Sequence, residues 1–309
     1  IVKNLSEVRP TMFLGVPAIF EALYKTIWKN IKKQGKESAV KKVMAINKFT
    51  KKLGFDLNKK FLKDVYKVFG GRLRVIISGG AAIDPAILQF FNDLGFIAVQ
   101  GYGLSECAPM GALNPDQHKY MRNASVGHIL PGMQVKIAGI GEICLKGDNV
   151  MLGYYKNPEE TAKVIKDGWF YTGDQGYTDD EDFIYITGRK KNVIIASNGK
   201  NVFPEELEYL LSKSPYVAES MVWGADDEKG DITIMASIRP DEEEVAEAIG
   251  EEKAKDDEAI KELLWKEVDR INADLPLFKK IKKISVRREE FEKNTSKKIK
   301  RFVEGNKKM

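Results

Sequence analysis

The stretch RLRVIISGGAAIDPAILQFFNDLGFIAVQGYGLSE, residues 72–106, contains the pattern that decides the fold. The β-branched run at 72–78 and the apolar run at 96–100 each have the length and composition of a buried strand. Residues 86–94, between these runs, predict a helix. A strand, a helix and a second strand in this order predict a right-handed βαβ unit within an α/β fold.

The ends of the predicted helix are marked in the sequence. Asp84 supplies an N-cap, Pro85 is a favoured first helical residue, and Gly95 ends the helix before the second strand. The segments SGGAA (78–82) and GYGLSE (101–106) then follow the carboxyl ends of two parallel strands. Because open α/β sheets bind ligands at this edge, we expect both segments to face one crevice.

The region 24–69 is rich in lysine, and its apolar residues recur at roughly helical spacing. This spacing predicts helices with a lysine-covered face and a buried stripe that contains Ile27, Ile31, Val40, Val43 and Met44. A second interpretation is a basic surface that rests on anionic lipid, which would matter if the substrate came from a membrane.

The remaining sequence changes pattern twice. Short alternating runs broken by Gly, Pro and Asp at 124–188 predict a small antiparallel barrel or sandwich. After GRKKN (188–192) an α/β mixture returns, with a helix near 261–275 whose apolar face holds Leu264, Val268, Ile271 and Leu275. The fold class is therefore α/β, with α+β parts. We expect a large domain at 1–190, comprising an α/β part at 1–123 and a β-rich part at 124–190, and a small α/β domain at 191–309.

The composition limits the class of protein. With 309 residues, 43% hydrophobic and 31% charged, the chain suits about two soluble domains. Its apolar runs are far below the ~20 residues that cross a bilayer, and no leader opens the chain, which begins at Ile1 within ordinary domain sequence. Cys107, Cys144, His118 and His128 lack the spacing of a disulfide framework or zinc site. We predict a cytoplasmic fragment of a longer protein, with peripheral contact at the inner membrane surface as the alternative.

The segment GYGLSE combines groups that suit a nucleotide. Gly101 and Gly103 leave the backbone open, and Tyr102 offers a flat face for a heteroaromatic ring. Ser105 and Glu106 add hard oxygen ligands that suit Mg²⁺ carried on phosphates. A purine nucleotide with magnesium would use every one of these groups, whereas the alternative is a tight turn with a surface acid.

Three further segments carry related chemistry. In WFYTGD (169–174) Asp174 can accept two hydrogen bonds from a vicinal diol, and in GRKKN Arg189 can brace the same ribose. In EKNTSKKIKR (292–301) a lysine delivered to a phosphorus centre would stabilise the charge that develops as an acyl adenylate forms. Taken separately, these segments also fit an ordinary turn acid, a surface arginine and a solvated tail.

In this order and at these separations the motifs resemble the adenylate-forming superfamily of acyl-CoA synthetases, luciferases and peptide-synthetase adenylation domains. The resemblance runs through essentially the whole chain and rests on SGGAAI, GYGLSE, GEICLKGDNVMLGYY, DGWFYTGD, GRKKNVIIASNGKNVFPEELE and EKNTSKKIKR. Within the superfamily, EVRPTMFLGVPAIFEALY, the lysine-rich segment and VFGGRLRVIISGGAAID are most similar to long-chain fatty acid CoA ligases.

The resemblance implies a role for each matching residue. Tyr102 would stack on adenine, Asp174 and Arg189 would hold the ribose, and the full set of ATP or AMP contacts would be Gly80, Ala81, Gly101, Tyr102, Gly103, Ser105, Asp174 and Arg189. Catalytic roles fall on Glu106, which would also hold Mg²⁺, and on Lys298, which aligns with the adenylation lysine. In the mobile C-terminal domain, Lys191 matches the hinge, and Gly199 and Lys200 belong to the loop that lines the CoA passage.

The implied reaction has two halves. A fatty carboxylate attacks the α-phosphorus of ATP to give acyl-AMP and pyrophosphate, and the thiol of CoA then displaces AMP. The implied ligands are ATP, Mg²⁺, CoA and a fatty acid, and we expect no nucleic-acid partner.

Two features depart from the family pattern. Lys297 stands where family members commonly have glycine, and the phosphate loop ending in Pro-Lys-Gly is not found in this sequence. We therefore expect a truncated large domain and an inactive fragment of a long-chain fatty acid CoA ligase. The alternatives are a fatty acyl-AMP ligase that loads a carrier protein, an aryl or short-chain CoA ligase, and a non-catalytic binding fragment. The sequence predicts neither acyl-chain preference nor oligomeric state.

Overall fold

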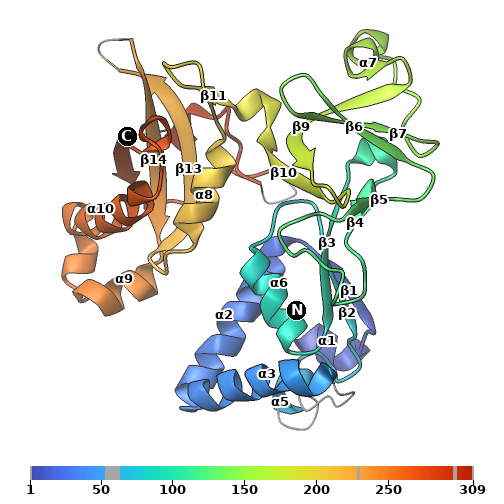
Figure 1. Cartoon of the computed structure of the whole chain (residues 1–309). Helices are drawn as coiled ribbons and strands as arrows, with labels where there is room; N and C mark the ends of the chain where they lie inside the picture. Colours follow the sequence, from blue (N-terminus) through green and yellow to red (C-terminus); the bar gives the residue numbers. More distant parts are fainter. Residues whose placement is uncertain (1, 53–62, 228–229, 295–297, 308–309) are drawn as a thin grey trace. The chain divides into compact units, whose positions relative to one another are not determined.

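The computed structural model describes residues 2–52, 63–227, 230–294 and 298–307 (Figure 1). The chain divides into two compact units. The first comprises Ile1–Thr172 and Gly176–Ile186, and the second comprises Gly173–Gln175 and Thr187–Met309.

A five-stranded sheet with the order β1-β2-β3-β4-β5 forms the centre of the first unit. Its strands are β1 (Met12–Gly15), β2 (Val75–Ser78), β3 (Ile97–Tyr102), β4 (Ala112–Leu113) and β5 (His128–Ile129). The first three strands are parallel, with Ile76 opposite both Phe13 and Ala98, whereas β4 and β5 are antiparallel. The sheet is therefore mixed, and the predicted α/β fold class is confirmed.

The predicted βαβ unit consists of β2, helix α6 (Pro85–Asp93) and β3. The Asp84 carboxylate accepts a hydrogen bond of 2.8 Å from the Ala86 backbone N–H, so the predicted N-cap is confirmed. Gly95 follows the helix with φ +101°, a conformation that glycine adopts without strain. Buried aromatic side chains then fix the helix on the sheet, with Phe91 packing edge-on against both Phe20 and Phe69.

The lysine-rich region is mainly helical where it is described, with a turn at 34–36 between two helices. The helices of this unit are α1 (Val2–Val8), α2 (Pro17–Lys33), α3 (Glu37–Lys52), α5 (Lys63–Val68), α6, the short η1 (Ser105–Cys107) and α7 (Pro158–Val164). The predicted apolar stripe is confirmed: Ile27, Ile31 and Val40 are buried, and Val43 and Met44 pack against the same core. Residues 53–62 lie outside the described part.

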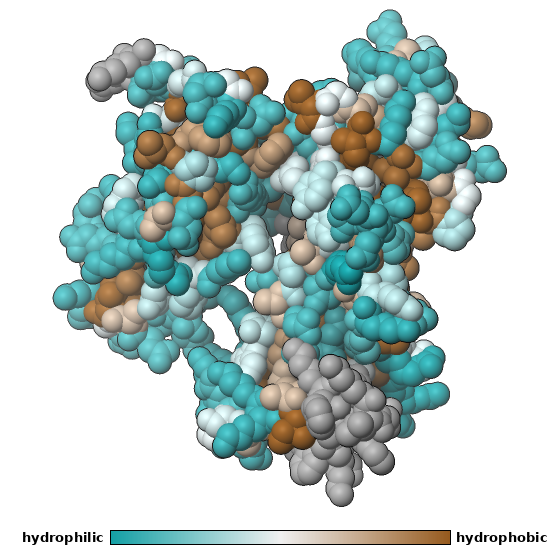
Figure 2. All heavy atoms as spheres, viewed as in Figure 1, coloured by the Kyte–Doolittle hydropathy of each residue, from teal (hydrophilic) through white to brown (hydrophobic). Residues whose placement is uncertain are grey.

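Exposed lysines lie on these helices, including Lys32 and Lys33 of α2 and Lys42 of α3. In the view of Figure 2, hydrophilic side chains cover most of the surface, and hydrophobic ones appear in small groups. Among the helices of the described ranges, none has the length and apolar character needed to cross a membrane.

The predicted small barrel is wrong, because the described strands form an open sheet with the order β10-β9-β7-β6. The alternating pattern did predict antiparallel pairing, which β6 and β7 show. However, β5 pairs with β4 and extends the first sheet, and the segment before it joins β10 by an isolated bridge between Gly127 and Ile184. The strands are β6 (Gln134–Ala138), β7 (Glu142–Lys146), β8 (Ile165–Lys166), which pairs with β9, β9 (Trp169–Thr178) and β10 (Ile184–Arg189).

The second unit is built on a three-stranded sheet in which β13 pairs antiparallel with β14, and β14 pairs parallel with β15. Buried residues of three helices, including Leu207, Val245 and Leu264, form one core with Val222 and Ile234 of the sheet. The predicted apolar face near 261–275 is confirmed by the burial of Leu264 and Val268, and Ile271 and Leu275 pack against the same core.

The strands of the second unit are β11 (Ile194–Ile195), β12 (Asn201–Val202), β13 (Val217–Asp226), β14 (Ile232–Pro240) and β15 (Lys283–Val286). The helices are α8 (Pro204–Ser212), α9 (Glu242–Ile249) and α10 (Asp257–Ala273), with short 3₁₀ turns η2 (Lys190–Asn192), η3 (Lys253–Lys255), η4 (Leu277–Lys279) and η5 (Glu304–Lys307).

Candidate functional site

The loops that follow β2 and β3 leave the same edge of the first sheet, because these parallel strands are neighbours with Ser78 opposite Gln100. The loop after β2 carries Gly80 and Ala81, both of which are exposed. Gly80 has φ +84°, so this backbone turn suits glycine. The sequence thus identified two adjacent loops at the carboxyl edge, where α/β sheets bind ligands.

The loop after β3 folds back on itself, which explains one of its glycines. A Cβ on Gly103 would lie 1.8 Å from the Pro109 carbonyl oxygen, so only glycine allows this approach. Tyr102 is 7% exposed and belongs to a core cluster with Cys107 and Ala112. The tyrosine is therefore held rigidly, with little of its surface open to solvent.

Glu106 is held by contacts that the sequence analysis missed. Its Oε1 accepts a hydrogen bond of 3.1 Å from the Tyr154 hydroxyl, and its backbone carbonyl accepts one of 2.7 Å from the Met151 N–H. The pKa of Tyr154 is raised above its usual value, mainly by partial burial and next by the hydrogen bond to Glu106. Tyr154 therefore stays a hydrogen-bond donor.

Asn149 also braces the loop that follows Tyr102, since its Nδ2 donates to the carbonyls of Cys107 at 2.8 Å and Met110 at 2.9 Å. Both Asn149 and Tyr154 lie within GEICLKGDNVMLGYY, so their motif was recognised although their contacts were not. The signal that could have identified these two residues is that both are polar and lie in a motif to which no chemistry had been assigned.

The donor set around Ser105 and Glu106 suits a magnesium ion that remains on phosphates. Among the residues that the structure describes, no group of three or more His, Cys, Asp or Glu side chains could hold a metal ion by itself. Mg²⁺ on a nucleotide needs only one or two carboxylates, because phosphates and water complete its coordination. The partly exposed Glu106 carboxylate and the exposed Ser105 hydroxyl are oxygen donors of this kind.

In the second unit, Asp174 on β9 and Arg189 at the end of β10 form an ion pair. The Arg189 Nε lies 2.8 Å from Asp174 Oδ1, and the Asp174 side chain is 6% exposed whereas that of Arg189 is 40% exposed. A carboxylate held by an arginine fork can accept hydrogen bonds from hydroxyl groups.

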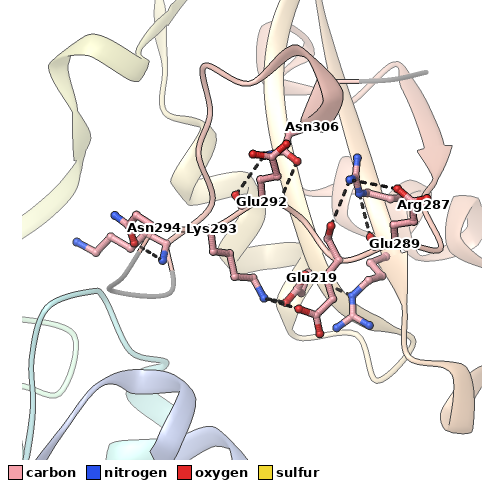
Figure 3. A network of polar contacts seen from close by, with 10 residues as sticks. Glu219, Arg287, Glu289, Glu292, Lys293, Asn294 and Asn306 are labelled. Atoms are coloured by element: carbon pink, nitrogen blue, oxygen red, sulfur yellow. Dashed lines mark hydrogen bonds and ion pairs between the residues drawn. The ribbon is translucent and has the colours of Figure 1, made fainter.

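Lys298 lies in the returning arm of a short hairpin. Its backbone N–H donates to Asn294 Oδ1 and its carbonyl accepts from the Asn294 N–H, both at 2.9 Å. Figure 3 shows Asn294 beside Lys293, whose side chain extends toward Glu219. Residues 295–297, which include the departure at Lys297, lie outside the described residues.

The charge of Lys298 is affected by the ion pair of Asp174 and Arg189. Burial lowers the pKa of Lys298 below its usual value, the Arg189 guanidinium lowers it further, and Asp174 opposes the change. The structure thus brings together three residues that the sequence had selected from separate motifs.

The residues implied in CoA binding and hinge motion occupy exposed positions of the second unit. Lys191 lies in η2, and Gly199 has φ +77° in the loop between β11 and β12. A Cβ on Gly199 would meet nothing within 4 Å, whereas Lys200 Nζ lies 4.9 Å from the centre of the Phe278 ring.

Comparison with known proteins places this chain in a family. The sequence profile described as "AMP-binding enzyme" matches residues 1–155, and that described as "AMP-binding enzyme C-terminal domain" matches residues 191–304. The chain belongs to the AMP-binding enzyme family.

Relatives within the AMP-binding enzyme family are acid–CoA ligases with different acids. A long-chain-fatty-acid–CoA ligase of Mycobacterium bovis is 33% identical over 256 residues, covering 78% of this chain and 42% of the relative. A 2-succinylbenzoate–CoA ligase of Listeria innocua is 36% identical over 172 residues, covering 54% of this chain and 37% of the relative. The chain therefore spans about two fifths of the length of these relatives.

A solved structure of the AMP-binding enzyme fold is also similar. The O-succinylbenzoate coenzyme A synthetase of Bacillus subtilis, in complex with ATP and a magnesium ion, matches with a TM-score of 0.60 and 27% identity. The match covers 74% of this chain and 45% of that chain.

Proposed function

We propose that the protein containing this chain is an AMP-forming acid–CoA ligase whose acid is a long-chain fatty acid. The observation that carries the proposal is the proximity of Lys298 to the Asp174–Arg189 pair, because these groups suit a phosphate and a ribose respectively. The choice of acid is supported by the long-chain ligase match over 78% of the chain, compared with 54% for the 2-succinylbenzoate ligase.

In the first half-reaction, the residues of this chain bind and orient ATP. Tyr102 contacts adenine beside the backbone of Gly80 and Ala81, and Asp174 accepts hydrogen bonds from the ribose hydroxyls while Arg189 holds Asp174 in place. Ser105 and Glu106 hold Mg²⁺, which would neutralise part of the phosphate charge when bound.

Lys298 stabilises the step in which the acyl adenylate forms. The fatty carboxylate oxygen attacks the α-phosphorus, the bond to the bridging oxygen of the β-phosphate breaks, and pyrophosphate leaves with that electron pair. An ammonium group beside the α-phosphate stabilises the charge of this transition state. Positioning and electrostatics then carry the chemistry, and no protein nucleophile is required.

In the second half-reaction, the CoA sulfur loses its proton to solvent and attacks the acyl carbonyl carbon, the bond from that carbon to the phosphate oxygen breaks, and AMP leaves with the electron pair. We assign Lys191 to a hinge between the two halves, and Gly199 and Lys200 to the loop that lines the CoA passage. The open space at Gly199 supports this assignment, because a pantetheine chain can approach a backbone that carries no side chain.

The first test is AMP release by the complete natural protein that contains residues 1–309. Mg-ATP is supplied with carboxylates from acetate to stearate, and with indoleacetate and 2-succinylbenzoate, in the presence or absence of CoA. We expect CoA-dependent release that is greatest with long chains. Release that needs no CoA would favour a ligase that loads a carrier protein, a preference for an aryl acid would contradict the fatty acid, and no release with any acid would favour a non-catalytic relative.

The role of Lys298 is tested by separating the half-reactions. Lys298→Ala is expected to lower adenylation by about 10²-fold or more, as for loss of a transition-state charge contact, and to spare thioester formation from supplied acyl-AMP. Lys300→Ala removes the same charge two residues away in the same arm and should leave both half-reactions nearly unchanged. Equal loss of both half-reactions in Lys298→Ala would contradict the assignment.

A further inference from the structure

The hairpin that carries Lys298 is closed by paired backbone and side-chain contacts. The Lys300 N–H donates to the Glu292 carbonyl at 2.8 Å, and Lys293 and Ile299 form an antiparallel β-bridge between the two arms. The fully buried Asn306 closes the base, because its Nδ2 donates to the carbonyls of Lys300 at 3.0 Å and Glu292 at 3.2 Å. Among the residues that the structure describes, these contacts hold the two arms to each other.

Each arm is fixed to the second-unit sheet by a charged side chain. In the outgoing arm, Lys293 forms an ion pair with Glu219 of β13 (Figure 3). At the end of the returning arm, Arg301 forms an ion pair with Glu208 of α8, and its NH1 donates to the Val222 carbonyl of β13 at 3.0 Å. Glu208 Oε1 in turn accepts from the Val222 N–H at 2.7 Å, so helix, strand and hairpin meet at one point.

The same turn of helix α8 holds the segment that follows Arg189. Glu205 Oε1 accepts a hydrogen bond of 2.6 Å from Asn192 Nδ2 and lies 3.7 Å from Arg301 NH2. A Cβ on Gly188 would lie 2.9 Å from Glu205 Oε2, so residue 188 packs directly on this carboxylate.

Helix α8 therefore connects the two polypeptide segments that carry Arg189 and Lys298. We propose that Arg301 is a positioning residue for Lys298, which it holds at a fixed distance from Arg189 through Glu208 and Glu205 of α8. The inference rests on the proposed function, in which Lys298 acts in adenylation. Arg301 lies three residues beyond Lys298, and its contacts with Glu208, Glu205 and the Val222 carbonyl constrain the returning arm.

A planar guanidinium is needed for this role, because one side chain must reach a carboxylate and a backbone carbonyl together. A lysine at position 301 would keep the ion pair with Glu208, but its single ammonium could not present the same fixed fork to the Val222 carbonyl. A small error in the position of a catalytic group lowers the rate of the step it serves, with less effect on substrate binding.

The test compares Arg301→Gln and Arg301→Lys with a matched control in the complete natural protein. Arg288 makes the same kinds of contact elsewhere in the unit, with its Nε 2.8 Å from Asp257 Oδ1 and its NH1 3.1 Å from the Ala254 carbonyl. Arg288→Gln therefore removes an ion pair and a carbonyl contact of the same kind, at a more exposed site, without affecting the hairpin.

We expect Arg301→Gln to lower kcat for adenylation by about 10-fold, with a change below about 3-fold in KM for ATP. Thioester formation from supplied acyl-AMP should stay within about 2-fold, since Lys298 does not act in that half-reaction. Arg301→Lys should recover part of the loss, and it is the variant to measure if Arg301→Gln does not fold. Equal loss in both half-reactions, or unchanged adenylation, would overturn the inference.

Hydrogen exchange at the Lys298 amide tests whether Arg301 holds the returning arm in place, independently of the reaction rate. This N–H is a suitable probe because it donates to Asn294 Oδ1. We expect exchange about 10-fold faster in Arg301→Gln than in Arg288→Gln. Unchanged exchange would overturn the inference even if activity fell. The inference and the proposed function can fail separately. Faster exchange in Arg301→Gln would support the positioning role of Arg301, whereas an unchanged adenylation rate in Lys298→Ala would show that the proposed function of Lys298 is wrong.

Discussion

The guanidinium of Arg189 lies 2.8 Å from the buried carboxylate of Asp174, and this pair joins the ends of two motifs that are separate in the sequence. Arg189→Gln should lower the free energy of unfolding by roughly 1–3 kcal/mol, because a buried carboxylate loses its cation. Urea denaturation measures the change. Arg270→Gln breaks the ion pair with Glu267 on α10, where the arginine is 66% exposed, and should cost below about 0.5 kcal/mol. Equal effects of both substitutions would contradict this prediction.

The pKa of Lys298 should set the alkaline limit of adenylation. Since burial and Arg189 lower this pKa, the ammonium is lost as pH rises through a value below the 10.5 of an ordinary lysine. Arg189→Gln should move the alkaline limb of kcat/KM to higher pH, and Asp174→Asn should move it to lower pH. The pH profile of pyrophosphate release measures both shifts. If both substitutions moved the alkaline limb in the same direction, the result would argue against Lys298 as the titrating group.

Glu208 should make the protein less stable as the solution approaches neutral pH. Burial raises its pKa from 4.5 to about 7, although Arg301 and the Val222 N–H lower it. Because the folded state holds this proton more tightly, the stabilisation is complete below pH 4.5 and is lost as pH rises through about 7. Glu208→Gln should remove a decline of about 3 kcal/mol across this range.

Urea denaturation between pH 4.5 and about 8 would measure the decline for Glu208. Glu247→Gln, at an exposed position of α9, is the control and should keep the slope of the unsubstituted protein. The prediction concerns the slope with pH, so the loss of the Arg301 ion pair in Glu208→Gln does not obscure it. Parallel curves for Glu208→Gln and the unsubstituted protein would show that Glu208 does not titrate here.

The close approach at Gly103 should make this position intolerant of alanine. A Cβ there would lie 1.8 Å from the Pro109 carbonyl oxygen, which is backbone and cannot rotate away. We expect Gly103→Ala to cost about 1–3 kcal/mol and to weaken nucleotide binding, because the loop must open. Gly79→Ala, where a Cβ meets nothing within 4 Å, should fold normally. Thermal unfolding and nucleotide titration of both variants measure this contrast, and similar behaviour would contradict it.

The sequence was sufficient to predict structure that depends on local chemistry. The βαβ unit was predictable because Asp84 caps α6, Pro85 begins it and Gly95 follows it, so neighbouring residues specify each boundary. Strand β1 was missed because Met12–Gly15 has only four residues, and Met12 and Leu14 are 56% and 67% exposed. A short edge strand with exposed apolar residues lacks the alternation that identifies strands.

Features that depend on distant pairing could not be predicted. β5 pairs with β4 of the first sheet, and its own two residues do not encode this partner. The ion pair of Arg301 with Glu208 spans 93 positions, and within EKNTSKKIKR the arginine looks like one more solvated cation. The motifs identified Asp174, Arg189 and Lys298, whereas their mutual proximity required the fold.

The assignment of Asp174 to the second unit has a consequence for recombination between members of the family. A crossover before Arg189 would combine Asp174 of one parent with the arginine of another, and a crossover after Asn192 would separate that asparagine from its native Glu205. The window Lys190–Lys191 preserves both native pairings. Chimaeric enzymes joined there should therefore tolerate exchange of the residues that follow the join better than those joined a few residues to either side.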